Sequence, residues 1–240
     1  AEHRIDFVSA TPSFWRRLLM FGSIEALRSA RPQHLTLGGE PVTDELLQRL
    51  RDVFPHARIT HIYATSELGR CFAVSDGRAG FPAHYLEHSP EKGVEMRVVN
   101  GELQLKSSNG ASSVACRGGD WFATGDLVEI TGNRVIFRGR STELIHVGGH
   151  KIHPSEVETV LREVAGVAEA HVYPIDSALV GSLLGARITP RPGIDARALE
   201  RSVRAHCARR LSPYQRPRIV DVVDCLELSD AHKLRRHIAA

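Results

Sequence analysis

The chain has 240 residues, of which 42% are hydrophobic and 25% charged, with a formal net charge of +3 at pH 7. This composition fits one large or two modest globular domains, and the small, dispersed positive charge favours solvated helix faces over a nucleic-acid surface. No apolar run approaches ~18 residues, so no membrane span is expected. Four separated cysteines without a C-x-x-C pair favour a reducing cytoplasm over a zinc site or a redox dithiol.

The first eighty residues predict alternating strands and helices. In chain order we expect a strand at 4–8, a helix that starts at Thr11-Pro12, a helix at 24–31, a strand at 34–39, a helix capped by residues 41–44, and a strand at 57–63. A strand, a helix and a strand in this order form a βαβ unit, which predicts a parallel sheet.

Chemically useful residues follow two of these strands, at 38–41 (GGEP) and 63–67 (YATSE). Ligands of open α/β sheets bind at the carboxyl ends of the strands. Tyr63 offers a stacking face there, and Glu67 offers a carboxylate for Mg²⁺ near phosphates. From the residues alone, a plain turn at the glycines and a surface carboxylate at Glu67 explain the pattern equally well.

Between residues 80 and 140, short runs that alternate apolar and polar residues predict an antiparallel sheet or small barrel. The segment ends in a hairpin around Thr131-Gly132-Asn133. Asp126 follows a glycine in a tight loop, where its carboxylate could accept hydrogen bonds from both ribose hydroxyls. Its alternative role is that of an ordinary turn-forming aspartate.

The last hundred residues predict a small α+β domain. The expected elements are a helix at 156–163 with Ser155 as N-cap and Glu158 completing a capping box, strands at 168–175 and 183–190, a helix at 195–211, and a strand at 219–223. A polar tail with one lysine, Lys233, follows. Without further context this lysine is a solvated tail residue.

Five segments in this order carry a resemblance to a known family. They are GGEP (38–41), YATSE (63–67), WFATGD (121–126), GRSTELIHVGGHKIHPSEVE (139–158) and LSDAHKLRR (228–236). The chain resembles the C-terminal part of the acyl-adenylate-forming superfamily, which includes acyl-CoA synthetases, peptide-synthetase adenylation domains and luciferase. The resemblance implies an α/β plus α+β fold. Residues 1–140 would be the C-terminal part of a large parallel-sheet (1–79) and β-barrel (80–140) adenylation body, and 141–240 a small mobile lid.

The resemblance also implies roles for single residues. Adenine would lie against Gly38, Gly39, Glu40 and Tyr63, and the α-phosphate near Thr65 and Ser66. Glu67 would hold Mg²⁺, Asp126 the ribose, and Arg140 the nucleotide, with Thr142 as hinge. Gly148 and Gly149 would line the thiol path, and Lys233 would be catalytic together with Glu67.

The implied activity is that of an ATP-dependent acid–thiol ligase. A small carboxylic acid would become acyl-AMP and pass to CoA or to the pantetheine of a carrier protein. ATP, AMP, Mg²⁺ and CoA or phosphopantetheine are the expected cofactors. The acid itself is not specified, because most walls of the acyl pocket would lie upstream.

Several departures from the family pattern are visible. No Gly-rich phosphate loop occurs in the 37 residues before Gly38, and the sequence starts at Ala1, so we expect a processed or truncated chain. Residues that differ from the usual ones are Ala64, Ser66, Thr142, Lys151 and His232. The alternative is a short homologue that does not adenylate, and that acts as a nucleotide-binding or regulatory module or as partner to a separate N-terminal half.

Overall fold

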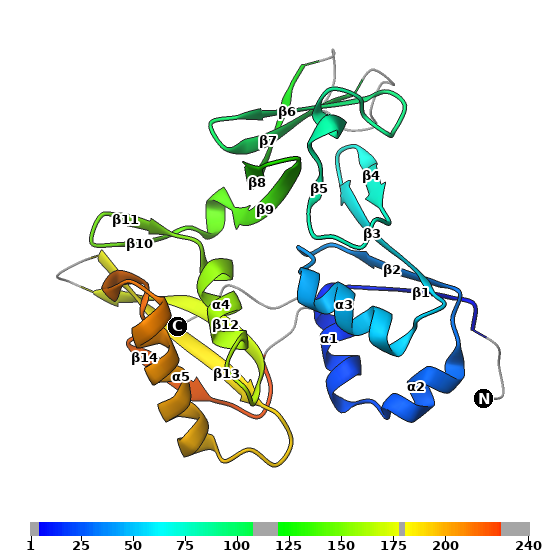
Figure 1. Cartoon of the computed structure of the whole chain (residues 1–240). Helices are drawn as coiled ribbons and strands as arrows, with labels where there is room; N and C mark the ends of the chain where they lie inside the picture. The colour runs from blue at the N-terminus through cyan, green and yellow to red at the C-terminus, as the bar shows by residue number, and fades with distance from the viewer. Residues whose placement is uncertain (1–4, 108–119, 178–180, 227–240) are drawn as a thin grey trace. The chain divides into compact units, whose positions relative to one another are not determined.

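The computed structural model describes residues 5–107, 120–177 and 181–226. The chain divides into two compact units, Ala1–Phe137 and Arg138–Ala240 (Figure 1), close to the boundary predicted after residue 140. Each unit is described on its own below. No helix in the described ranges is long and apolar enough to cross a membrane.

The first unit begins with a sheet whose strand order is β1-β2-β3-β4. Its elements are β1 (Phe7–Ala10), α1 (Pro12–Phe21), α2 (Ile24–Ala30), β2 (His34–Gly38), α3 (Asp44–Val53), β3 (Arg58–Thr65) and β4 (Gly69–Val74). Strands β1, β2 and β3 are parallel, which confirms the predicted βαβ unit, and β4 adds antiparallel to β3. The first strand starts at Phe7, later than predicted.

Helices α1 and α3 begin where the sequence predicts, because a threonine caps each of them. The side-chain oxygen of Thr11 accepts a hydrogen bond from the backbone N–H of Phe14, and that of Thr43 from the N–H of Leu46. Both helices pack apolar side chains against the sheet, and the fully buried members of this core are Trp15, Leu35, Leu37, Leu46, Leu47 and Leu50.

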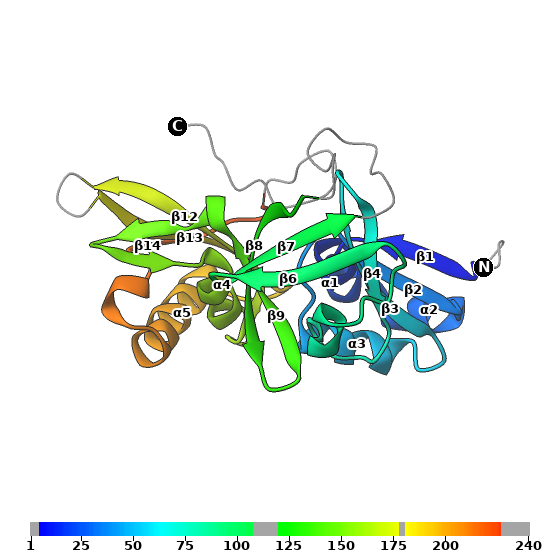
Figure 2. The same cartoon turned by 90° about the horizontal axis from the view of Figure 1, so that it is seen from above.

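The second sheet of this unit is antiparallel, in the order β5-β9-β8-β7-β6. Its strands β6 to β9 are labelled in Figure 2. Its elements are β5 (Phe81–Pro82), a 3-10 turn at Ala83–Leu86, β6 (Val94–Val99), β7 (Glu102–Ser107), β8 (Phe122–Thr131) and β9 (Arg134–Arg140). The predicted antiparallel region and its final hairpin are therefore confirmed. The core includes Cys71 and Phe72 of β4, so the β3–β4 hairpin packs against this sheet.

Arg134 pins the loop that joins the two sheets. Its side chain is buried, at 4% exposure, and forms an ion pair with Asp76. Its guanidinium donates at 2.8–3.2 Å to three consecutive loop carbonyls, those of Arg78, Ala79 and Gly80. The buried guanidinium thus donates hydrogen bonds to loop carbonyls that are not paired with any strand.

The second unit is an α+β domain, as predicted. It contains a 3-10 turn at Ser141–Glu143, β10 (Ile145–Val147), β11 (His150–Ile152), α4 (Pro154–Arg162), β12 (Val167–Ser177), β13 (Gly181–Pro190), α5 (Ala196–Arg210), a 3-10 turn at Pro213–Gln215, and β14 (Ile219–Val222). The sheet order is β11-β10-β13-β12, and β14 pairs parallel with β13. Helices α4 and α5 bury one apolar stripe each in a common core, including Val157, Leu161, Leu199 and Val203.

The capping box predicted at the start of α4 is wrong. The helix begins at Pro154, and the N-cap position is His153, whose side chain makes no capping bond. The Ser155 hydroxyl instead donates to the carbonyl of Arg138 at 2.7 Å. Glu158, 2% exposed, turns inward, and its Oε1 accepts the backbone N–H of Val172 at 3.1 Å. The carboxylate therefore satisfies a buried N–H of β12.

This arrangement predicts that Glu158→Ala lowers the free energy of unfolding by about 2–3 kcal/mol, because a buried N–H loses its acceptor. Glu158→Gln keeps an acceptor oxygen at the same place and should lose less than half as much. Urea denaturation of both variants measures the difference. Equal loss in the two variants would show that the charge of Glu158, and not its hydrogen bond, is what stabilises the fold.

Candidate functional site

Two predicted nucleotide-binding residues meet in the first unit. The Tyr63 hydroxyl, near the end of β3, donates to Oδ2 of Asp126 in β8 at 2.6 Å. Asp126 is only 9% exposed. Burial, with a further contribution from the Asp126 charge, raises the pKa of Tyr63 above its usual value. The phenol therefore stays protonated and donates to the carboxylate over the whole neutral range.

Aromatic neighbours fix the direction of the Tyr63 hydroxyl. The Tyr63 ring stacks on Phe72 with 5.1 Å between centroids and 24° between planes, and it contacts Phe137 at 5.1 Å and 33°. Offset contacts of this kind favour a single ring orientation. Part of the ring surface that the sequence assigns to adenine is therefore already covered by Phe72.

Asp126 lies within β8 and not in the tight loop that the sequence predicted, and this stretch of β8 is fastened to β7. The Thr124 hydroxyl donates to the carbonyl of Leu103 at 2.7 Å and accepts the N–H of Asp126 at 3.0 Å. The N–H of Gly125 donates to Oε1 of Glu102 at 2.7 Å. Gly125 has φ of 75°, which a glycine adopts without strain. These hydrogen bonds hold the backbone at Asp126, and therefore its carboxylate, in a fixed position.

The β3–β4 turn holds the residues assigned to the phosphates. The Thr65 hydroxyl oxygen accepts the N–H of Leu68 at 3.1 Å and closes the turn. Ser66 is exposed and Glu67 half-buried, and Glu67 forms no ion pair or hydrogen bond with any residue in the described ranges.

The oxygen ligands on this turn suit a magnesium ion that is shared with a nucleotide. Within residues 5–107, 120–177 and 181–226 no three His, Cys, Asp or Glu side chains gather in a way that could hold a metal. One carboxylate on an accessible turn is nevertheless the protein contribution that Mg²⁺ needs when phosphates and waters supply its other ligands. Glu67 therefore fits the role that the sequence gives it, which stays a prediction.

In the GGEP segment the two glycines offer only their backbone, whereas the carboxylate of Glu40 has a structural role. Gly38 ends β2, and Gly39 follows with φ of 81°. Oε2 of Glu40 accepts both the N–H and the hydroxyl of Ser13, at 2.8 and 2.7 Å, and lies 3.7 Å from Arg16. The Glu40 side chain thus anchors the first turn of α1, and the contact of Gly38 and Gly39 with adenine stays a prediction.

The remaining candidates belong to the second unit or lie outside the described residues. Arg140 ends β9 and is exposed, and Thr142 is exposed in the following 3-10 turn. Gly148 and Gly149 form the two-residue turn between β10 and β11, with φ of 55° and 86°. Lys233 falls outside the residues that the structure describes. Within the first unit, the structure therefore brings Tyr63 and Asp126 together.

One aromatic pair near the glycine turn was not predicted. The ring of His150, the residue after Gly149, lies flat on the ring of Tyr214, with 3.9 Å between centroids and 3° between planes. Tyr214 lies in the 3-10 turn that follows α5. Because the two residues are far apart in sequence, no local pattern indicates their contact.

Two family models match the chain, one in each unit. The model of the AMP-binding enzyme family matches residues 1–121, and that of the AMP-binding enzyme C-terminal domain matches residues 156–233. The chain therefore belongs to the AMP-binding enzyme family, as the five sequence segments indicated.

Individual relatives agree with this assignment. The rice "4-coumarate--CoA ligase-like 5" is 25% identical over 236 residues, which is 98% of this chain and 43% of that protein. A Mycobacterium tuberculosis medium/long-chain-fatty-acid–[acyl-carrier-protein] ligase is 33% identical over 120 residues, 48% of this chain and 22% of that protein.

The fold also matches a solved structure. An anthranilate–CoA ligase in complex with anthranoyl-AMP has a TM-score of 0.77 and 22% identity, covering 95% of this chain and 48% of that ligase. The predicted fold class is thereby confirmed. The chain spans about half the length, or less, of the relatives it matches.

Proposed function

We propose that this chain supplies the nucleotide-binding edge and the lid of an AMP-forming acid–thiol ligase. The observation that carries the proposal is the 2.6 Å contact between Tyr63 and Asp126, which brings together two residues from different sheets, both assigned to the nucleotide. A buried, rigidly held carboxylate is suited to accept hydrogen bonds from the two hydroxyls of a ribose. Relatives named as CoA and carrier-protein ligases support the same reaction class.

In the proposed reaction a carboxylate attacks the α-phosphate of ATP and displaces pyrophosphate to give acyl-AMP. The thiol, losing its proton, then attacks the acyl carbon and displaces AMP to give the thioester. Two anions must meet in the first step, so positive charge near the α-phosphate lowers the barrier. Bound Mg²⁺ would supply part of that charge, and Glu67 would hold it. Lys233 would supply the rest, and the exposed turn at Gly148 and Gly149 would border the thiol path. ATP and a free thiol acceptor suit the reducing cytoplasm expected from the cysteines.

We expect Lys233→Ala to lower acid-dependent exchange of pyrophosphate into ATP by about 100-fold, the effect of removing one transition-state donor. AMP affinity should change less than about twofold, because the lysine acts on the phosphate in the transition state and not on the bound nucleoside. The exchange is measured with the longest polypeptide that contains this sequence, against a panel of aryl and fatty acids.

Arg235→Ala is the matched control, because it removes a cation from the same tail and should leave the exchange unchanged. Undiminished exchange in Lys233→Ala would contradict the assigned role. AMP binding without any exchange in the unaltered protein would instead support the second candidate, a nucleotide-binding module.

A further inference from the structure

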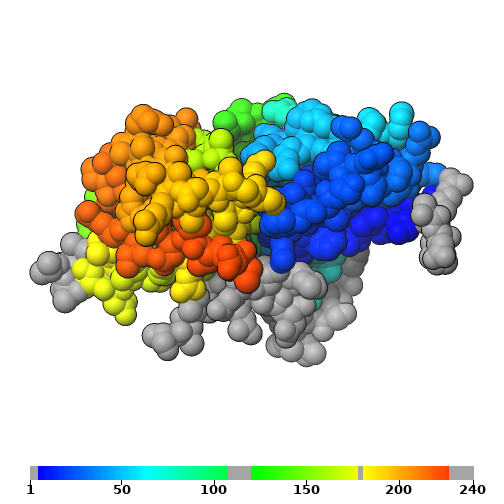
Figure 3. Space-filling model, turned by 90° about the horizontal axis from the view of Figure 1, so that it is seen from below, coloured from blue at the N-terminus to red at the C-terminus, as the bar shows by residue number. Residues whose placement is uncertain are grey.

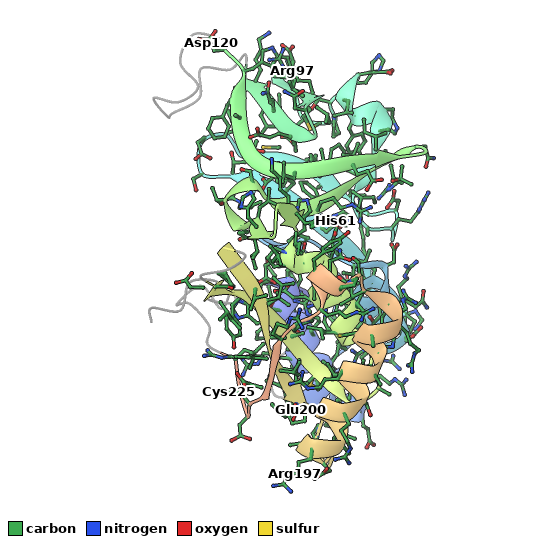
Figure 4. All side chains as sticks on the ribbon, turned by 90° about the vertical axis from the view of Figure 1, so that its left-hand side faces the viewer. His61, Arg97, Asp120, Arg197, Glu200 and Cys225 are labelled. Atoms are coloured by element: carbon green, nitrogen blue, oxygen red, sulfur yellow. The ribbon has the colours of Figure 1, made fainter. Side chains whose placement is uncertain are left out.

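One flank of α5 carries a row of arginines. Arg197, Arg201 and Arg204, at positions i, i+4 and i+7, lie on the same flank of the helix, away from its buried residues. All three are exposed. They are called the α5 stripe here. Figure 3 shows the surface over α5 in gold and orange, and Figure 4 shows Arg197 pointing away from the helix.

The positive charge of the α5 stripe is mostly uncompensated. Nε of Arg204 pairs with Glu200 at 2.8 Å, and both side chains are well exposed. Arg197 and Arg201 form no ion pair or hydrogen bond with any residue in the described part of the chain. Exposed arginines without partners keep the favourable interaction energy available for an external anion.

The positive surface continues past the end of the helix. Nη1 of Arg204 donates to the carbonyl of Arg218 at 3.4 Å, which places the exposed Arg218 beside the stripe. Nη2 of Arg216 donates to the carbonyl of Ala208 at 2.9 Å, so this arginine lies against the last turns of α5. The stripe arginines span ~10 Å of the helix, and the contact of Arg216 with Ala208 extends the positive surface to ~16 Å along it.

The same segment leads to the glycine turn. Tyr214, two residues before Arg216, stacks on His150 at 3.9 Å, and His150 directly follows Gly149. The stacked pair therefore fastens the tip of the β10–β11 hairpin to the segment that follows α5. A partner bound to the α5 stripe would be held at a fixed distance from Gly148 and Gly149, because all these parts belong to one compact unit.

We propose that the α5 stripe, with Arg216 and Arg218, is the docking surface for an acidic carrier protein that brings the acceptor thiol to the Gly148-Gly149 turn. This inference rests on the proposed function and selects one of its two acceptors. A row of cations over ~16 Å of helix matches a negatively charged protein surface, whereas the phosphates of free CoA need only a compact cluster. One relative, similar over 48% of this chain, is itself named as a carrier-protein ligase.

The test measures binding of a purified, acidic holo acyl-carrier protein to the 240-residue chain by biolayer interferometry at two salt concentrations. We expect Arg197→Glu/Arg201→Glu/Arg204→Glu to weaken binding at least ~10-fold and to flatten its salt dependence. The matched control reverses three exposed arginines of the first unit, Arg17, Arg28 and Arg58, and should change binding less than ~2-fold. Circular dichroism establishes that both triple variants are folded.

The outcomes separate this inference from the proposed function. Equal binding by the stripe variant and the control variant overturns the docking surface. An equal loss of free CoA binding in the stripe variant also overturns it, since the surface would then serve phosphates. AMP binding without carrier-protein binding refutes the docking surface alone, and absence of both refutes the proposed function as well.

Discussion

Asp126→Asn lowers the affinity of the chain for AMP by about 100-fold in our expectation. A hydrogen bond to a charged group contributes about 1.5–3 kcal/mol, and the variant weakens two such bonds from the ribose hydroxyls. A combined loss of about 3 kcal/mol corresponds to a factor of about 100 in the dissociation constant. The asparagine Oδ1 can still accept the Tyr63 hydroxyl, so this stretch of β8 should keep its conformation. Isothermal titration with AMP measures the effect.

Tyr63→Phe is the control that separates the ribose contact from the internal contact. It keeps the ring between Phe72 and Phe137 but removes the hydroxyl that Asp126 accepts. We expect a stability loss of about 1 kcal/mol and less than about a 5-fold change in AMP affinity, because the carboxylate remains. Similar losses of affinity in the two variants would show that Asp126 serves only to orient Tyr63.

Arg134→Met removes about 3–5 kcal/mol from the free energy of unfolding of the first unit in our expectation. Methionine fills most of the arginine volume, so the loss comes from the carbonyls of Ala79 and Gly80, which no longer have a buried donor, and from the lost partner of Asp76. The carbonyl of Arg78 keeps its contact with Nε2 of His61 at 3.1 Å. The thermal midpoint should fall by about 10 °C. Differential scanning calorimetry checks this.

Two further variants test why Arg134 stabilises the loop. Asp76→Asn should cost less than about 1 kcal/mol, because the Asp76 side chain is 40% exposed and water replaces the ion pair. Arg134→Lys keeps the charge but not the planar group of donors, so its stability should lie between those of the other two variants. A lysine variant as stable as the unaltered chain would show that charge, not donor geometry, holds the loop.

Local signals explain what the sequence predicted well. Thr11 and Thr43 each cap the helix that follows them, and the periodicity of Leu46, Leu47 and Leu50 places α3 on the sheet. These signals act within one helical turn, so they are visible in a short stretch of sequence. The parallel order of β1, β2 and β3 follows from the same signals through chain connectivity.

Long-range contacts explain the features that the sequence did not predict. Ser155 and Glu158 have the spacing of a capping box, but each is taken by a backbone group elsewhere, at Arg138 and Val172. Buried backbone groups need hydrogen-bond partners, so these tertiary contacts prevail over the capping box. Asp126 and Tyr63 were both assigned to the nucleotide, yet their mutual hydrogen bond spans 63 positions, and no local pattern predicts it.

The turn at Gly148 and Gly149 has a consequence for how this segment varies over evolution. Both residues have left-handed backbone angles, and nothing lies within 4 Å of a Cβ added to either. Glycine is thus required here by backbone conformation and not by crowding. In homologues, asparagine and aspartate should replace these glycines first, since they tolerate this conformation best among residues with a side chain. A larger residue at either position in a homologue would then indicate a rebuilt hairpin, whatever thiol that homologue uses.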